Sequence, residues 1–171
     1  GTGVTPPLSA SHSNPGGAGR ANSITGTSIT YAAGGSAGPA TGGGVGTPGL
    51  GNGGPGGANP TGGNQPGGPG GGGIVVVAYK LSESAPSAKA TGGNVSIYNN
   101  YAIHTFTHSG TFTNTSGSDI TGVEYVVIGG GGAGGGGAVS NNGQNAGGGG
   151  GGAGGYVTAS GQTISTTPFP I

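Results

Sequence analysis

The chain has 171 residues, of which 50 are glycine and 12 are proline, and its three basic and three acidic residues give a net charge of zero. Leu, Ile, Val and Phe total 26, which excludes a hydrophobic core of ordinary size. The absence of cysteine excludes disulfides and thiolate metal sites, and so few positive charges argue against a nucleic-acid partner, which requires clustered neutralisation of phosphates.

The glycine and proline content is typical of disordered chains, but disorder usually also requires a high net charge. Zero net charge therefore favours ordered glycine tracts. A thin core needs additional support, and we expect it from backbone hydrogen bonds between close-packed glycine segments and from association with other copies. No stretch reaches 18 consecutive apolar residues, so the sequence predicts no membrane insertion.

In chain order, residues 22–33 suit two short strands joined by a turn. Residues 34–73 are a Gly/Pro/Asn tract without an apolar run. The next segment, IVVVAYK at 74–80, is short, β-branched and bounded by glycine, which predicts a strand. Residues 81–91 are small or polar and include one proline, so we predict a linker there.

From about Gly92 onward, polar and apolar residues alternate with a period of two, as in half-buried strands. The alternation places His104, Phe106 and His108 on one face and Ile103, Thr105 and Thr107 on the other. Another strand runs into the second glycine tract near Ile128, and a strand restarts near Tyr156. Because no apolar 3.6-residue period occurs, we expect an all-β fold without an α-helix.

Three structures compete for the glycine tracts. Collagen requires glycine at every third residue, and residues 46–60 break that period. A flexible linker is the simplest alternative. The third is a bundle of polyglycine II helices, extended threefold helices that lack internal hydrogen bonds and pair laterally. In that bundle we expect Pro48, Pro55, Pro60, Pro66 and Pro69 to lie in the outer layer, because proline lacks an N–H donor.

The motifs YAIHTFTHSGTFT, GVEYVVIGGGGAGGGG and GGGGAGGYVTASGQTIS resemble the glycine-rich domain of phage tail-fibre proteins and large bacterial surface proteins. The resemblance covers nearly the whole chain. Related glycine-rich folds, including phage tail-tip adhesins and the ectodomain of anaplastic lymphoma kinase, hold polyglycine II bundles. We therefore expect a small β-sandwich or jelly-roll-like core with a polyglycine II bundle.

The order of the motifs departs from the family, because the opening motif follows the closing strand. Residues 1–80 resemble the second, C-terminal half of a glycine-rich domain, residues 81–91 the linker, and residues 92–171 the first, N-terminal half of the next domain. Three explanations remain open. The chain is one repeat of a tandem array, each copy donates a half-domain to its neighbour, or the chain is a circular permutant that folds alone.

The main hypothesis is a non-enzymatic structural subunit or repeat of a self-assembling extracellular filament or surface fibre, with other copies of itself as partners. We expect no cofactor and no metal or catalytic site. The alternative is a receptor-binding adhesin module of a phage tail fibre, located on the virion tail, whose tips at 61–69 and 139–146 contact cell-surface glycans. The residues that we predict to take part in assembly are Ile74, Val75, Val76, Val77, Tyr79, Phe106, Phe112, Tyr125, Val127 and Ile171.

The polar side chains that could carry chemistry are few, and ordinary surface roles also account for them. His104 and His108 with His12 could bind a metal, but ordinary strand histidines are the favoured interpretation. Asp119 and Glu124 flank the start of a strand, and acid–base chemistry would require a cleft and a tuned environment, which the sequence does not indicate. Asn94 and Asn114 each begin an N-x-S/T sequon, and whether either carries a glycan stays open.

Overall fold

The computed structural model describes residues 15–37, 45–58, 64–83, 87–139 and 145–171. Within these ranges the secondary structure is β throughout, which confirms the predicted all-β class, and no helix is long and apolar enough to cross a membrane. The chain divides into two compact units. We call residues 1–21, 30–73 and 128–156 the glycine unit, and residues 22–29, 74–127 and 157–171 the sheet unit.

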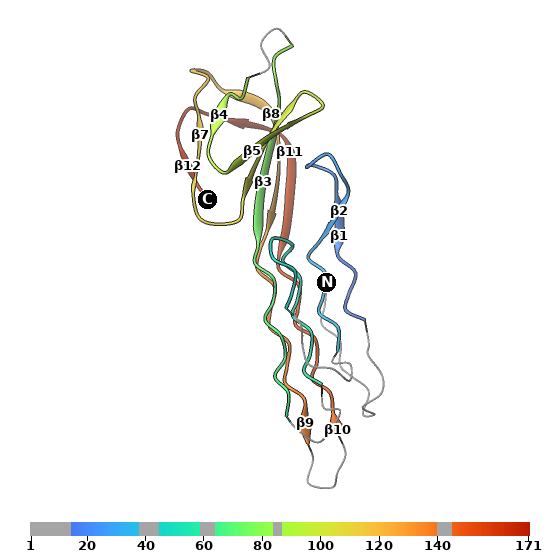
Figure 1. The fold of residues 1–171 in the computed structure, drawn as a ribbon. Helices are drawn as coiled ribbons and strands as arrows, with labels where there is room; N and C mark the ends of the chain where they lie inside the picture. Colours follow the sequence, from blue (N-terminus) through green and yellow to red (C-terminus); the bar gives the residue numbers. More distant parts are fainter. Residues whose placement is uncertain (1–14, 38–44, 59–63, 84–86, 140–144) are drawn as a thin grey trace. The chain divides into compact units, whose positions relative to one another are not determined.

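The strands of the described residues form four sheets, and Figure 1 labels them. Their bounds are β1 (Arg20–Asn22), β2 (Ile29–Tyr31), β3 (Ile74–Lys80), β4 (Ala90–Thr91), β5 (Asn94–Tyr98), β6 (Tyr101–Phe106), β7 (Thr111–Asn114), β8 (Ile120–Ile128), β9 (Ala138–Val139), β10 (Asn145–Ala146), β11 (Tyr156–Ile164) and β12 (Phe169–Pro170). β1 pairs with β2, and β10 with β9. The larger sheets have the orders β11-β8-β3-β6-β5 and β12-β7-β4.

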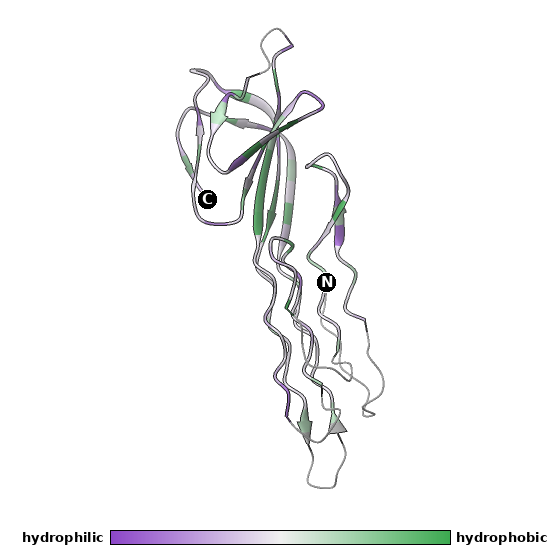
Figure 2. Cartoon of the chain, viewed as in Figure 1, coloured by the Kyte–Doolittle hydropathy of each residue, from purple (hydrophilic) through white to green (hydrophobic). Residues whose placement is uncertain are grey.

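The strand predicted at 74–80 is β3, and it occupies the middle of the five-stranded sheet. Its run of β-branched residues favours extended backbone, and Figure 2 shows it among the most hydrophobic parts of the chain. β3 pairs antiparallel with β6, with Val77 opposite His104 and Lys80 opposite Tyr101. Residues from both sides of the predicted linker 81–91 therefore share one sheet.

The predicted linker itself contributes to the sheet unit at both of its ends. Leu81 is buried, and its N–H donates to the carbonyl of Asn100. Ala90 is also buried and belongs to β4, which pairs antiparallel with β7. Residues 84–86 lie outside the described residues.

A two-residue hairpin joins β5 to β6. Asn99 and Asn100 both have positive φ, 46° and 64°, between the paired residues Tyr98 and Tyr101. Two consecutive left-handed residues define a type I′ turn, which matches the twist of the flanking strands, and asparagine tolerates this conformation better than other non-glycine residues. The dipeptide Asn-Asn thus fixes the register of the outermost strand, β5.

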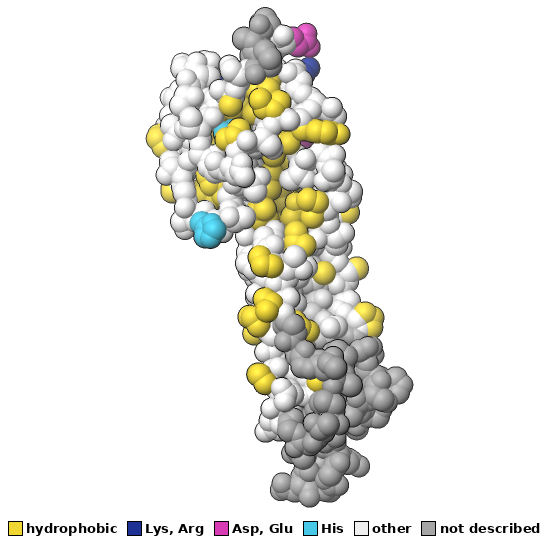
Figure 3. Space-filling view, in the orientation of Figure 1, with side chains coloured by type: hydrophobic (Ala, Val, Ile, Leu, Met, Phe, Trp, Pro, Cys, Tyr) yellow, Lys and Arg dark blue, Asp and Glu magenta, His cyan; other side chains and the backbone are white. Residues whose placement is uncertain are grey.

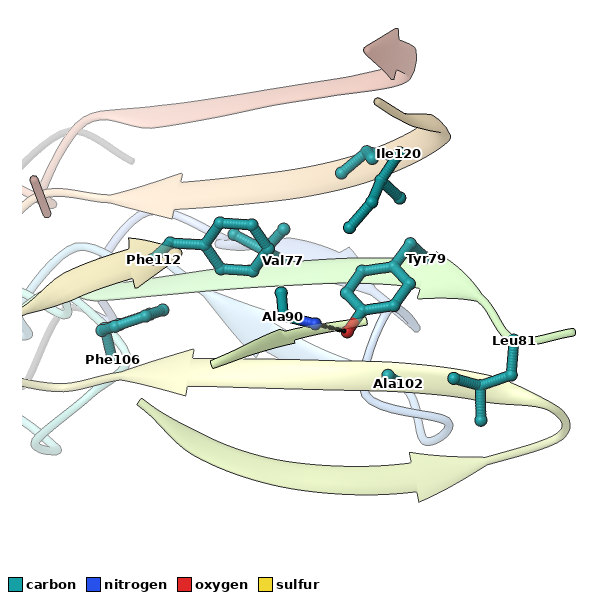
Figure 4. Packing of buried hydrophobic residues seen from close by; sticks show 9 residues of the cluster. Val77, Tyr79, Leu81, Ala90, Ala102, Phe106, Phe112 and Ile120 are labelled. Atoms are coloured by element: carbon teal, nitrogen blue, oxygen red, sulfur yellow. Dashed lines mark hydrogen bonds between the residues drawn. The ribbon is translucent and has the colours of Figure 1, made fainter. Parts of the chain in front are cut away.

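The main core draws side chains from both larger sheets, as Figure 4 shows. Its buried members are Val77, Tyr79, Leu81, Ala90, Ala102, Phe106, Phe112, Ile120 and Val123. The rings of Tyr79, His104 and Phe112 contact one another, with the last two edge to face at 5.0 Å between centroids. Side chains from two sheets thus share one small aromatic core.

A second, smaller cluster lies on the other face of the five-stranded sheet. Val76, Ala78 and Ile103 are buried there, and Ile24, Ile74 and Tyr101 pack against them. His104 and Phe106 face the main core, so the predicted alternation along this strand is confirmed for these positions. His108 lies beyond the end of β6 and is exposed, so the predicted common face does not extend to it.

In the glycine unit, hydrogen bonds between segments recur at every third residue. The N–H groups of Gly129, Gly132 and Gly135 donate to the carbonyls of Gly155, Gly152 and Gly149. The N–H groups of Gly131, Gly134 and Gly137 donate to Gly71, Gly68 and Gln65. Both sets run antiparallel, and the three-residue spacing differs from the two-residue alternation of a β-strand.

Segment 51–58 is bonded to four other segments. From Gly53 onward its N–H groups donate to the segments at 33–36 and 132–135, and the N–H of Gly51 donates to Gly72. Its carbonyls accept from the segments at 68–71 and 148–154. Most of its residues are buried, including Ala58. Buried backbone groups require partners, and here other backbones supply them almost without side chains.

Close approach explains why these segments are glycine. A Cβ atom at Gly54 would meet the carbonyl oxygens of Gly68 and Pro69, and one at Gly151 would meet that of Gly132, nearer than real Cβ atoms come. At Gly152 a Cβ atom would find nothing within 4 Å. Side chains are therefore forbidden only on the inner positions of the unit.

The prolines divide between two environments. Pro48, Pro66 and Pro69 are exposed, as expected for outer positions, whereas Pro55 is half-buried within segment 51–58. Pro55 is tolerated there because its carbonyl accepts the N–H of Gly68, while donation is left to its glycine neighbours. Pro60 lies outside the described residues.

Candidate functional site

Nine of the ten predicted assembly residues lie in or against the cores of their own chain. Val76, Val77, Tyr79, Phe106 and Phe112 are buried, and Ile74, Val75, Tyr125 and Ile171 pack partly buried against them. Val127 is 38% exposed. The five buried residues can therefore contact a second copy only if strands are exchanged between chains, whereas Val75, Tyr125 and Ile171 are also accessible from the surface.

Six of the ten line one apolar groove of about 460 Å³ in the sheet unit. These are Val75, Val77, Phe112, Tyr125, Val127 and Ile171. The exposed side chains Val157 and Phe169 also border the groove, and no charged residue lines it. The face of the molecule drawn in Figure 3 carries few charged side chains. The groove can hold an apolar group but offers no chemistry.

The most elaborate polar arrangement surrounds the hydroxyl of Tyr79. It accepts the N–H groups of Lys89 and Ala90, both at 2.9 Å, and lies 3.1 Å from Nε2 of His104. Nδ1 of His104 lies 2.8 Å from the carbonyl of Gly92. Figure 4 shows the tyrosine reaching from β3 to β4. The side chains of β3 and β6 thus hold the backbone of residues 89–92.

These contacts determine the tautomer of His104 and the direction of its hydrogen bonds with Tyr79 and Gly92. With two N–H donors on its oxygen, Tyr79 gives its own proton to Nε2 of His104, and Nδ1–H then donates to Gly92. Burial lowers the pKa of His104, while the bond to Gly92 opposes that shift. Burial likewise raises the pKa of Tyr79, and the N–H groups of Lys89 and Ala90 oppose it. Both groups are therefore neutral.

A second buried polar side chain, Asn114, holds the end of β7. Its Nδ2 donates to the carbonyls of Ser118, Ile164 and Ser165 at 2.8–3.3 Å, and its Oδ1 accepts from Ser116. Only 4% of Asn114 is exposed, so its sequon is closed to glycosylation in the folded chain. Asn94 is exposed on β5.

The remaining polar candidates do not come together. His108 is exposed and contacts Thr107, and Asp119 and Glu124 are both exposed. Among the described residues no group of three or more His, Cys, Asp or Glu is placed to hold a metal ion. His12 lies outside the described residues, as do 61–63 and 140–144 of the two predicted binding tips.

Sequence reasoning missed the roles of Tyr79 and Asn114. Tyr79 interrupts the apolar run of β3 with a hydroxyl, which was a signal for a buried hydrogen bond. Asn114 precedes the residues Thr-Ser-Gly-Ser, a turn composition that favours asparagine side chains bonded to nearby backbone.

Comparison with known proteins covers the second part of the chain. Residues 106–171 match the family model of a glycine-rich domain, a span that includes β7, β8, β11 and β12. The match is narrower than the resemblance expected from the motifs, which extended over nearly the whole chain. No curated protein and no solved structure matches the sequence significantly. Residues 106–171 thus carry the sequence features of a glycine-rich domain.

Proposed function

We propose that the chain is a non-enzymatic structural unit of an extracellular or cell-surface fibre, and that its glycine segments form a polyglycine II bundle. The observation that carries the proposal is segment 51–58, bonded to four other segments at a three-residue spacing. Polyglycine II helices have three residues per turn and no internal hydrogen bonds, so a stable bundle requires such lateral bonds in several directions.

The bundle would act mechanically. Its strength comes from backbone hydrogen bonds, its surface carries almost no charge, and its buried amides offer few sites to proteases. The polar groups of the sheet unit support a structural role rather than catalysis, because Tyr79 and His104 are neutral and fully paired with each other and with backbone. The carboxylates Asp119 and Glu124 are exposed, and among the described residues neither belongs to a group of three or more His, Cys, Asp or Glu placed to hold a metal ion.

Continuity along the fibre has two possible sources. In the first, copies follow one another in one covalent chain. In the second, residues 1–80 of one copy complete residues 92–171 of the next, so that β3 enters a neighbour's sheet. The exchange keeps every contact of β3 with β6, and a heterologous contact of this kind continues without closing. The burial of five predicted assembly residues in the cores, with four more packed partly buried against them, supports exchange as the mode of contact.

The first test is the denatured mass of the native material together with electron microscopy. Filaments with a single denatured species of 15.4 kDa support exchange between separate copies. Filaments with a ladder in steps of that mass support tandem linkage. A monomer at all concentrations that binds cells would overturn the fibre and favour the phage tail-fibre adhesin.

The polyglycine II geometry has its own test. A near-atomic experimental structure of the fibre should show the glycine segments with three residues per turn and a rise of ~3.1 Å per residue. Glycine segments that are paired as β-strands, with a two-residue alternation, would disprove the bundle while leaving the fibre proposal standing.

A further inference from the structure

The outermost strand of the five-stranded sheet, β5, presents an apolar and uncharged edge. In the described part of the chain β5 pairs only with β6. All five of its residues are exposed, and Val95, Ile97 and Tyr98 are 41%, 57% and 49% exposed. These are three of the seven large hydrophobic side chains that the described residues expose.

Two of these side chains lie on the same face of the sheet. Val95 pairs with His104 and Ile97 with Ala102, and directly paired residues point to the same face. His104 and Ala102 both belong to the main core face. Val95 and Ile97 therefore extend that apolar face to the open edge, where nothing in the described chain covers them.

Proteins normally protect such an edge with lysine, proline, a bulge or an inward-pointing charge. β5 has none of these, since its sequence is NVSIY. The other outer strand of the sheet, β11, is different, because Gly161 has a φ of +67° within it and interrupts its regular backbone. Of the two outer strands, β5 is the one suited to pair with another strand.

We propose that β5 pairs with β5 of a second copy, antiparallel and centred on Ser96. This register places Val95 of each copy directly opposite Ile97 of the other, so the two exposed aliphatic side chains become cross-strand neighbours on the same face. Ser96 faces Ser96, and Asn94 faces Tyr98. The contact is isologous, as in most homodimers, and joins two five-stranded sheets into one of ten strands.

The pairing goes beyond the proposed function, because it joins two copies side by side rather than end to end. Five residues form a small contact, so free copies should pair weakly. Copies held in one fibre are already concentrated, and the same contact then becomes effective between neighbouring fibres. The sequon at Asn94 lies on this strand, so a glycan there would block the contact.

Cysteine cross-linking tests the register, because the chain contains no cysteine of its own. The variant Ser96→Cys should form a disulfide-linked dimer roughly tenfold faster than Ser160→Cys, an exposed control on β11, since directly opposed Cβ atoms lie within or near disulfide reach. Asn94→Cys alone should stay monomeric, because its two copies would lie ~13 Å apart along the strand. The double variant Asn94→Cys with Tyr98→Cys should cross-link.

Charge substitution supplies an independent test. Ile97→Lys should abolish concentration-dependent dimers in sedimentation experiments, whereas Val157→Lys, a control on β11 that is 56% exposed in the native chain, should leave them unchanged. Loss with both variants would indicate pairing of β5 with β11 and overturn the two-fold contact. Equal cross-linking at 96 and 160 would also overturn it. Filaments that persist in Ile97→Lys but no longer associate laterally would separate this contact from the fibre itself.

Discussion

The two units of the molecule are stabilised in opposite ways. In the sheet unit, side chains such as Phe112 and Tyr79 fill a core between two sheets and also hold loop backbone in place. In the glycine unit, segments such as 51–58 bond directly to their neighbours, and inner side chains larger than alanine are few. The sheet unit should therefore fail when a side chain is removed, and the glycine unit when one is added.

Removing the central aromatic ring should have the largest effect. Phe112 is 1% exposed and contacts the rings of Tyr79 and His104. Phe112→Ala should lower the free energy of unfolding by about 3–5 kcal/mol, the usual cost of such a cavity. Urea unfolding followed by circular dichroism measures it, with the exposed Phe169→Ala as control. Similar losses of unfolding free energy in both variants would show that the position of Phe112 in the core does not determine the loss.

Removing the hydroxyl of Tyr79 should have the second-largest effect on stability. In Tyr79→Phe the N–H groups of Lys89 and Ala90 and Nε2 of His104 lose their partner. Each buried group left unpaired costs about 1–3 kcal/mol, although the losses do not simply add. Amide hydrogen exchange should show faster exchange at Ala90. Unchanged exchange there would mean that the hydroxyl does not hold residues 89–92.

Adding a methyl group to the glycine unit should be costly at one position and harmless at another. Gly54→Ala places a Cβ atom against backbone oxygens and should destabilise by about 1–3 kcal/mol, as overpacking does. Gly152→Ala meets open space and should stay within about 0.5 kcal/mol of the parent chain. Hydrogen exchange of the glycine amides compares the two. Equal effects would refute close packing as the reason for glycine.

The smallest effect is on pH dependence. Because burial lowers the pKa of His104, the unfolded chain binds its proton at higher pH than the folded chain does. The contribution of His104 to the free energy of unfolding is fully present above the pKa of histidine in the unfolded chain, ~6.5, and is lost as pH falls below it. The slope from this group is at most about 1.4 kcal/mol per pH unit. His104→Gln should flatten this part of the profile. An unchanged slope would assign it to other groups.

The predictability of the two units also differs. β3 and the alternation along β6 could be predicted from residue type, because Val, Ile and Phe favour buried positions in strands. The hairpin at Asn99 and Asn100 was readable from its composition but was not predicted. That β3 pairs with β6 of its own chain could not be deduced, since many neighbours would accept a run of valines.

The pairing of the glycine segments is even harder to predict from the sequence. Their composition predicted close-packed threefold segments, but glycine has no side chain to specify which segment lies beside which. The partners of Gly54 and Gly132 lie far from them in sequence, and no residue pattern marks them. Burial of Pro55 was missed for the same reason, because no pattern marks segment 51–58 as the inner one.

The three-residue spacing has a consequence for changes in chain length. In the proposed polyglycine II bundle, inserting one residue into a segment turns all later residues by a third of a turn and directs their N–H donors at the wrong neighbours. Inserting three restores the alignment and lengthens the segment by ~9 Å. Since segment 51–58 bonds to four others, the partners must lengthen with it. The glycine segments of this unit should therefore change in length together and in steps of three residues, both in evolution and in engineered variants.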